Sequence, residues 1–284
     1  MKMLAFLINT NLFISFAAVA FTMQAQIQLG LPPGFHPYLF IIFFATLFEY
    51  NLHRLITLAY HKNALKSPKH EWLRENRKAF YVLVILSVLG FLVSICFAKK
   101  EVLIALFPIA CLTIFYTLPV YRIRQKLLRL REVPGLKIFM ISSVWAAVTV
   151  LLPLIESGTQ PDLEHTVMMI TERFFFVFAI TVPFDIRDIE ADTHAGLKTI
   201  PVVYGEKASV SLAVLSIIIF ITVAGIHYVS HDQWWQALAM VSSGIITGMT
   251  ILSKRLQKFR YYHYGILDGA MILQPVLVAL AFML

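Results

Sequence analysis

Long apolar stretches separated by short polar breaks run through this chain from end to end. Hydrophobic residues make up 59% of its 284 positions and charged residues only 14%, whereas about 25% is typical of soluble domains. A water-soluble fold of this size cannot bury so much apolar surface, so lipid must be its solvent. Backbone polar groups in lipid have to pair within their own segment, which favours helices. We therefore predict an all-α polytopic membrane protein in which residues 1–284 form one transmembrane domain.

Apolar windows of about 20 residues, the length that crosses a bilayer, predict nine spans. The predicted spans are 3–24, 38–59, 79–98, 102–120, 137–155, 165–184, 208–229, 234–252 and 265–283. Of the 24 Lys and Arg residues, 20 lie on one side of such a bundle and two on the other. Because basic residues accumulate in cytoplasmic loops, this bias predicts a protein of the cell inner membrane with a cytosolic N-terminus and the C-terminus outside.

The first apolar stretch has an alternative interpretation as a signal peptide. It follows Lys2 and includes the sequence Ala18-Val19-Ala20, which has small residues at the two positions that a cleavage site requires. Removal of that segment would leave eight spans.

Three aspartates follow the sixth apolar stretch at spacings i, i+3 and i+7: Asp185, Asp188 and Asp192. On a helix these positions share one face. Carboxylates so close together repel one another unless a cation lies among them, and their hard oxygen atoms suit Mg²⁺, which commonly also binds phosphate and water. We interpret the three as catalytic residues and Mg²⁺ ligands. The alternative is a solvated loop with a helix-capping aspartate.

A second stretch, residues 196–205, follows the aspartates and reads G-L-K-T-I-P-V-V-Y-G. The pattern D-x-R-D-x-x-x-D followed by G-x-K-T-I-P-V resembles the second aspartate-rich motif of the UbiA superfamily of intramembrane prenyltransferases. Nine spans with basic even-numbered loops are similar to that family too. The resemblance implies a central cavity in which a prenyl group passes from its diphosphate to an aromatic or quinone-type acceptor. It also implies Mg²⁺ ions that neutralise the leaving diphosphate.

The first aspartate-rich motif of that family, N-D-x-x-D-x-x-x-D at the end of the second span, is degenerate here. Asn51 is retained, but Leu52, Leu55 and Ala59 stand at the aspartate positions. None of these three can hold a metal, so we expect one Mg²⁺ site instead of two and a reduced or altered activity. Phe184 also stands where many members have Asn.

Polar residues around the same helix end offer a different way to hold a diphosphate. Glu49 and His53 are i, i+4 neighbours that can pair. The planar guanidinium of Arg54 suits phosphate, so we hypothesise that cationic side chains substitute for the missing metal. The alternative is a snorkelling arginine with structural histidines. The residues expected to bind substrate are Asn51, His53, Arg54, Tyr116, Arg122, Arg187 and Lys198.

Two charged residues within apolar stretches need partners. Arg173 falls roughly at mid-membrane, where it would cost about 2.5–3.5 kcal/mol on insertion scales. We expect it to pair with Glu172 or Glu49, or to reach water in the cavity. Asp268 begins the ninth span, where it is either functional or simply favoured by the helix N-terminus.

Other classes of function remain open or are excluded. A non-catalytic relative that binds an isoprenoid or quinone lipid, and a transporter of lipid phosphates, are the alternatives to a prenyltransferase. Nucleic-acid binding is not expected, because the basic residues follow membrane topology and form no single folded basic face. The two cysteines have neither metal-ligand spacing nor a disulfide pattern.

Overall fold

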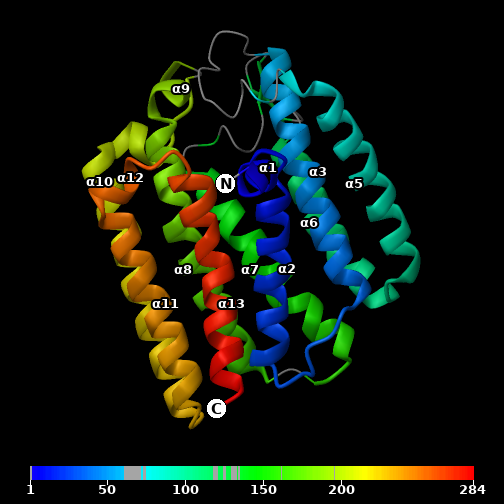
Figure 1. Ribbon diagram of the computed structural model, residues 1–284, viewed down its shortest axis with the longest axis vertical. Helices are drawn as coiled ribbons and strands as arrows, with labels where there is room; N and C mark the ends of the chain where they lie inside the picture. The colour runs from blue at the N-terminus through cyan, green and yellow to red at the C-terminus, as the bar shows by residue number, and fades with distance from the viewer. Residues whose placement is uncertain are drawn as a thin grey trace.

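The computed structural model describes residues 2–60, 72, 75–117, 121–123, 126–128, 133, 135–160, 162–194 and 196–284. Long helices run side by side through this part of the chain (Figure 1). In the first half they are α1 (Lys2–Asn9), α2 (Leu12–Gln28), α3 (Pro37–Tyr60), α5 (Arg77–Phe97), α6 (Lys100–Thr117) and α7 (Leu136–Ser157). In the second half they are α8 (Leu163–Arg187), α9 (Ile189–His194), α10 (Ile200–Ser230), α11 (Trp234–Leu252), α12 (Lys254–Gln257), the π-helical turn η2 (Tyr262–Leu267) and α13 (Asp268–Phe282). The predicted helical membrane fold is confirmed.

On a strict criterion of length and hydropathy, the described part of the chain contains fewer candidate spans than predicted. Six helices in the described part of the chain are long and apolar enough to cross a membrane, or seven if α1 and α2 count as one bent span. Helices α3 and α6 match the predicted spans 38–59 and 102–120, but neither is among those six. The prediction of nine is therefore not confirmed.

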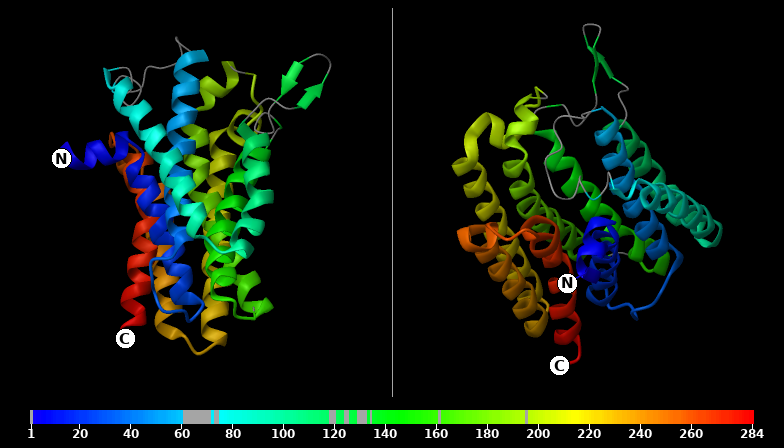
Figure 2. Two further views of the ribbon diagram at one scale, coloured as in Figure 1. Left: turned by 90° about the vertical axis from the view of Figure 1, so that its right-hand side faces the viewer. Right: turned by 45° about the horizontal axis from the view of Figure 1, so that its top comes forward.

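A short hairpin departs from the all-helical pattern. Strand β1 (Tyr121–Ile123) pairs antiparallel with β2 (Lys126–Leu128) in the basic segment after α6. Figure 2 shows the hairpin projecting beyond the helices at the end of the bundle that carries α9. The apolar pattern gave no signal for it, because two strands of three residues are too short to show a period of two.

Helix α8 packs between α7 and α10 (Figure 1) and is the most buried of the six candidate membrane spans in the described chain. The main core joins α2, α8, α10, α11 and α13 through buried side chains such as Phe21, Phe176 and Phe220. Gly244 lets α10 and α11 approach closely, since a Cβ there would lie 2.6 Å from the Ile221 side chain. This packing holds the middle of α8 in the main core, and several polar residues lie on either side of it along that helix.

The buried Arg173 finds partners other than the expected carboxylates. Its Nη2 donates to Gln28 Oε1 on α2 at 2.8 Å, and its guanidinium lies 3.8 Å from the centre of the Phe21 ring. Glu172 acts on it only as a neighbouring charge. Hydrogen bonding and cation–π attraction thus offset the burial of this charge.

The first predicted span, 3–24, is wrong as a single helix. Helices α1 and α2 meet at 82° across a break at Thr10 and Asn11. Asn11 has φ 64°, a left-handed conformation that Asn tolerates better than most residues. Its side chain donates to Asn51 Oδ1 at 3.0 Å, and Asn51 Nδ2 donates to the Thr10 carbonyl at 3.1 Å. A buried amide pair therefore holds the bend against α3.

The bend yields a stability prediction. Asn11→Ala forces an alanine into the left-handed region and removes the bond to Asn51, whereas Asn11→Gly removes only the bond. The alanine variant should lose about 1–2 kcal/mol more free energy of unfolding than the glycine variant. Unfolding titrations in detergent micelles measure the difference. Equal losses would show that the left-handed conformation at position 11 costs alanine no more free energy than it costs glycine.

Candidate functional site

The three predicted aspartates lie at one end of the bundle, where α8 ends and the chain turns back towards α10. Asp185 is in the last turn of α8, Asp188 caps that helix, and Asp192 lies in α9. Gly196 follows with φ 71°, and the N–H of Leu197 bonds to the Asp192 carbonyl at 2.9 Å. Such a helix end favours glycine. The first glycine of the sequence motif thus turns the chain back over the aspartates.

Asp185 is neutralised by a lysine from a neighbouring helix. Lys137 Nζ, in the first turn of α7, lies 2.6 Å from Asp185 Oδ1. The Asp185 side chain is 1% exposed and the Lys137 side chain 16% exposed. A buried carboxylate requires such a partner, because an unpaired buried charge is strongly destabilising. This ion pair ties the ends of α7 and α8 together.

Asp188 is held by its neighbour in the sequence. Arg187 donates from Nε to Asp188 Oδ1 at 2.7 Å and from Nη2 to Asp188 Oδ2 at 2.9 Å. Burial acts to raise the pKa of Asp188, but the hydrogen bonds and charge of Arg187 outweigh it and leave the pKa below its ordinary value. Asp188 therefore stays ionised.

Asp192 is the least compensated of the three carboxylates. Burial raises its pKa above the ordinary value, the charges of Asp185 and Asp188 add to the rise, and Lys137 opposes it. Its Oδ2 is buried and accepts no hydrogen bond within the described residues. An additional cation would lower the pKa of Asp192 and stabilise its carboxylate.

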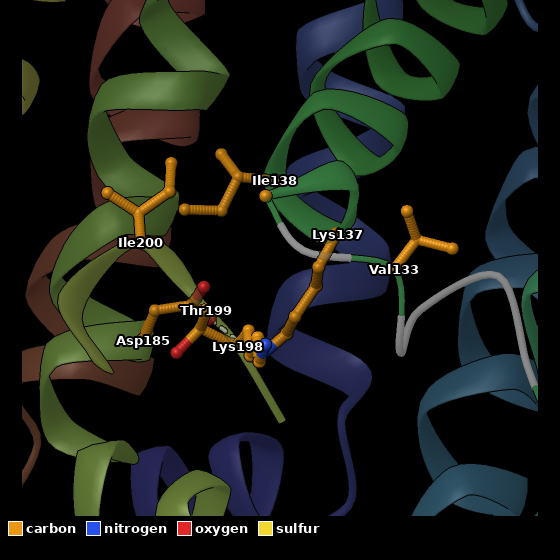
Figure 3. Close-up of a pocket in the computed structure, with 8 residues that line it drawn as sticks. Val133, Lys137, Ile138, Asp185, Lys198, Thr199 and Ile200 are labelled. Carbon is orange, nitrogen blue, oxygen red and sulfur yellow. Dashed lines mark hydrogen bonds and ion pairs between the residues drawn. The ribbon is translucent and has the colours of Figure 1, made fainter. Parts of the chain in front are cut away.

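A small pocket opens beside these groups (Figure 3). Lys137 and Asp185 point towards each other across it, and Lys198 and Thr199 reach it from the segment before α10. Its remaining lining residues are Val133, Gly135, Ile138 and Ile200. The space is too tight for a water molecule, so a ligand would require these side chains to separate.

The three aspartates are of the ligand type that Mg²⁺ prefers, and the surroundings of Asp192 also favour a bound cation. Their oxygen atoms are hard ligands, and the buried Oδ2 of Asp192 accepts no hydrogen bond in the described chain. Within the described ranges, however, no three His, Cys, Asp or Glu side chains form a group that could hold a metal by themselves. Mg²⁺ commonly binds one or two carboxylates together with substrate phosphates. This set of residues matches that mode better than an all-protein cage.

A second cluster lies on the other face of the α8 end and centres on Tyr264 in η2. The guanidinium of Arg187 lies 4.9 Å from the centre of the Tyr264 ring, and that of Arg54 lies 5.7 Å from it. Phe184 packs against the rings of His263 and Tyr264. Two cations thus lie near one aromatic ring, in a π-helical turn of a kind that often marks functional sites.

Asn51 and Arg54 are both built into the bend of the N-terminal helices. Asn51 is fully buried, and both of its amide hydrogens bond to backbone carbonyls, those of Thr10 and Leu47. Arg54 is 8% exposed and donates from Nη1 to the Asn9 carbonyl at 2.9 Å. Asp268, also buried, favours the Arg54 charge electrostatically. These contacts give Asn51 and Arg54 a packing role.

The other residues expected to bind substrate are spread over several elements. Lys198 is exposed and lines the pocket, and Arg187 lies in the Tyr264 cluster. His53 is half-buried on α3. The side chains of Tyr116 and Arg122 lie outside the described part of the chain.

Sequence reasoning missed Lys137, Thr199 and Tyr264 as members of the site. Lys137 counted only as one of many basic residues that signal topology, and its pairing depends on how α7 packs on α8. Thr199 lies inside the recognised motif, and its hydroxyl reaches the pocket. Tyr264 gave no signal, because aromatic residues are common in membrane helices.

The fold and the site define an integral membrane protein with an ionic site at one end of its helix bundle. Residues 74–260 match the sequence profile of the UbiA prenyltransferase family, and the chain belongs to that family. None of the curated protein sequences matches the chain significantly.

Solved structures share the fold at low sequence identity. A UbiA homologue from Archaeoglobus fulgidus bound to GPP and Mg²⁺ has a TM-score of 0.63 and 13% identity, over 95% of this chain and 99% of that one. A UbiA homologue from Aeropyrum pernix K1 has a TM-score of 0.62 and 12% identity, over 96% and 98%. A structure of digeranylgeranylglyceryl phosphate synthase has a TM-score of 0.57 and 14% identity, over 98% and 95%. These likenesses extend over nearly the whole chain.

The two ion pairs of the site should differ in their contribution to stability. Lys137→Gln leaves a buried carboxylate without its cation and should cost about 3–5 kcal/mol of unfolding free energy. Adding Asp185→Asn should recover much of that loss. Asp188→Asn, which breaks a pair about one-third exposed, should cost about 1 kcal/mol or less. Unfolding titrations in micelles test the contrast, and similar costs for both pairs would contradict it.

Proposed function

We propose that this protein transfers a prenyl group from a prenyl diphosphate to a hydrophobic, aromatic or quinone-type acceptor within the membrane. The observation that carries the proposal is the family match together with the placement of the second aspartate motif. That motif forms an ionic site at the end of α8 from carboxylates, lysines and an arginine. A diphosphate needs cations to bind and to leave, and both lysine and arginine suit it.

The diphosphate is proposed to bind over the pocket between α7, α8 and the segment before α10. Lys198 is exposed at that pocket and can offer its charge without breaking a hydrogen bond or ion pair to another described residue. Arg187 and Lys137 lie on either side of the α8 end, and each is already paired with an aspartate. A bound diphosphate would compete with those carboxylates for the cations, and this competition would open the closed pocket.

Asp188 and Asp192 are proposed to hold one Mg²⁺ together with the diphosphate. When bound, the metal would neutralise charge on the leaving diphosphate. Asp192 gains most from a cation, because its pKa is raised by burial and by the two neighbouring carboxylates. The residues of this chain otherwise act by orientation: Lys137 fixes Asp185, and Arg187 fixes Asp188. The Archaeoglobus homologue bound to GPP and Mg²⁺ supports this assignment by fold.

The prenyl chain and the acceptor are proposed to reach the site from the lipid. Each CH₂ group that moves from water to an apolar environment contributes about 0.8 kcal/mol, so a long prenyl chain remains in the bilayer. We also propose an inner-membrane location with the ionic site on the cytosolic side, which the distribution of Lys and Arg supports.

A non-catalytic lipid-binding relative is the second candidate, and one observation favours it. The stretch that carries the first aspartate motif in other members here carries Asn51 and Arg54, which bond to the backbone around the α1–α2 bend. Such a protein would bind an isoprenoid or quinone lipid without turning it over. Release of diphosphate distinguishes the two functions.

Binding of a geranyl thiodiphosphate to the protein in lipid nanodiscs tests the proposed residues. Lys198→Gln should weaken binding about tenfold or more, because a hydrogen bond to a charged group contributes about 1.5–3 kcal/mol. Asp192→Asn should abolish the strengthening of binding by Mg²⁺. Calorimetry with and without Mg²⁺ measures both effects, and diphosphate release from geranyl diphosphate measures turnover.

Matched controls come from charged residues outside the site. Lys207→Gln and Glu190→Gln change exposed residues of α10 and α9 and should leave binding within twofold. If Lys198→Gln and Asp192→Asn bind like the parent protein, the proposed site is wrong. Binding without any release of diphosphate, with several acceptors, would favour the non-catalytic candidate.

A further inference from the structure

A row of largely buried polar groups joins the N-terminal half of α8 to the C-terminal end of α10. Glu172 on α8 contacts His227 Nδ1 on α10 through its Oε1. His227 Nε2 lies 2.7 Å from Nδ1 of His165, in the first turn of α8. His165 Nε2 lies 2.9 Å from the backbone carbonyl of Gln28 on α2. The row therefore links three helices by three contacts of hydrogen-bond length.

These three contacts need one more proton than the two neutral histidines possess. Each contact joins two atoms that carry lone pairs, and it becomes a hydrogen bond only if a hydrogen lies between them. A neutral imidazole carries one N–H, so His165 and His227 together supply two hydrogens. The Gln28 carbonyl only accepts, which fixes a hydrogen on His165 Nε2. The third hydrogen must be an additional proton.

The additional proton has three places in the row. It can lie on Glu172 as a neutral carboxylic acid, on His227 as an imidazolium, or on His165 as an imidazolium. Moving it among these places only shifts hydrogens along existing contacts, and each position leaves all three bonds formed. Without this proton, one contact places two lone pairs against each other.

The surroundings of the row differ between its two ends. Glu172 and His227 are almost completely buried, with 1% and 0% of their side chains exposed. Arg173 and Tyr228 are the titratable groups that face Glu172. His165 is only half-buried, and Asp162 and the exposed His231 face it. From α2 and α11 the neighbouring polar groups are Gln28 and Met240, which carry no charge.

We propose that Glu172, His227 and His165 form a proton-binding site that shares one exchangeable proton between the helix interior and water at the His165 end. Within the described ranges, no three His, Cys, Asp or Glu side chains are grouped as metal ligands would be. Glu172 lies about two and a half turns into α8, so the proton is carried roughly a third of the way along that helix. This site is separate from the aspartates, which lie at the other end of α8 and in α9.

The number of protons in the row predicts how the packing of α2, α8 and α10 depends on pH. Below the apparent pKa of the row, the proton is bound and α2, α8 and α10 are joined by three hydrogen bonds. Above it, one bond is lost and two lone pairs oppose each other. Packing of the three helices should therefore weaken as the pH rises through that value.

Glu172→Gln is a sharp test because glutamine supplies a permanent third hydrogen. Its amide N–H can donate to His227 Nδ1, so all three bonds form without an exchangeable proton. ¹⁵N NMR of histidine-labelled protein in nanodiscs follows each ring between pH 5 and 9. In the parent, His165 and His227 should titrate together with one apparent pKa, as coupled groups do. In Glu172→Gln this common step should be lost, and both rings should stay neutral.

Two control variants, and the results that would contradict the proposal, can also be stated. Glu206→Gln and His194→Gln change exposed residues far from the row and should leave the common step intact. Persistence of the step in Glu172→Gln, or independent titration of the two rings near the ordinary value of about 6.5, would overturn the proposal. The parent alone provides a second test if the variant does not fold. His165 Nε2 must carry a hydrogen up to the common step, and its deprotonation below that pH would also overturn the proposal.

Discussion

The ion pair between Lys137 and Asp185 is the contact on which the ionic site depends. A carboxylate that is 1% exposed, at the end of a membrane helix, cannot persist without a nearby cation. The lysine comes from the first turn of α7, so neutralising Asp185 also fixes where α7 begins relative to α8. The pocket with Lys198 and Thr199 forms around this pair, and Asp192 feels both of its charges. Neutralising the charge of Asp185 therefore also determines how α7 packs against α8 at this end of the bundle.

Helix α8 carries polar side chains towards both ends and apolar packing between them. At one end, carboxylates are matched by Lys137 and Arg187. Near the other, Glu172 is matched by histidines, and Arg173 by Gln28 and Phe21. Between the two, Phe176 and its neighbours join the main core. A helix so placed can bind a charged ligand at one end while its other end stays anchored to α2 and α10.

Hydropathy was sufficient to predict a helical membrane fold, because apolar runs of this length have few other solutions in lipid. The motif around Asp185, Asp188 and Asp192 was sufficient to predict acidic side chains at a helix end, since local spacing determines that end and the turn after it. Their roles as catalytic residues and Mg²⁺ ligands stay a prediction. The bend at Asn11 could not be predicted from the sequence, because an Asn inside an apolar run does not indicate a left-handed conformation. The partner of Asp185 could not be predicted either, because it depends on which helices pack together. Arg173 was correctly expected to need partners, but an amide and an aromatic ring served in place of the carboxylates.

The most direct test of the proposed function is a structure of this protein with a prenyl thiodiphosphate and Mg²⁺ in lipid. The account predicts the diphosphate over the pocket at the end of α8, in contact with Lys198, and one Mg²⁺ between the diphosphate and Asp192. It also predicts that the side chains of Lys137 and Asp185 separate to admit the ligand. A diphosphate bound elsewhere in the bundle, with the Lys137–Asp185 pair closed and Asp192 free of metal, would contradict it.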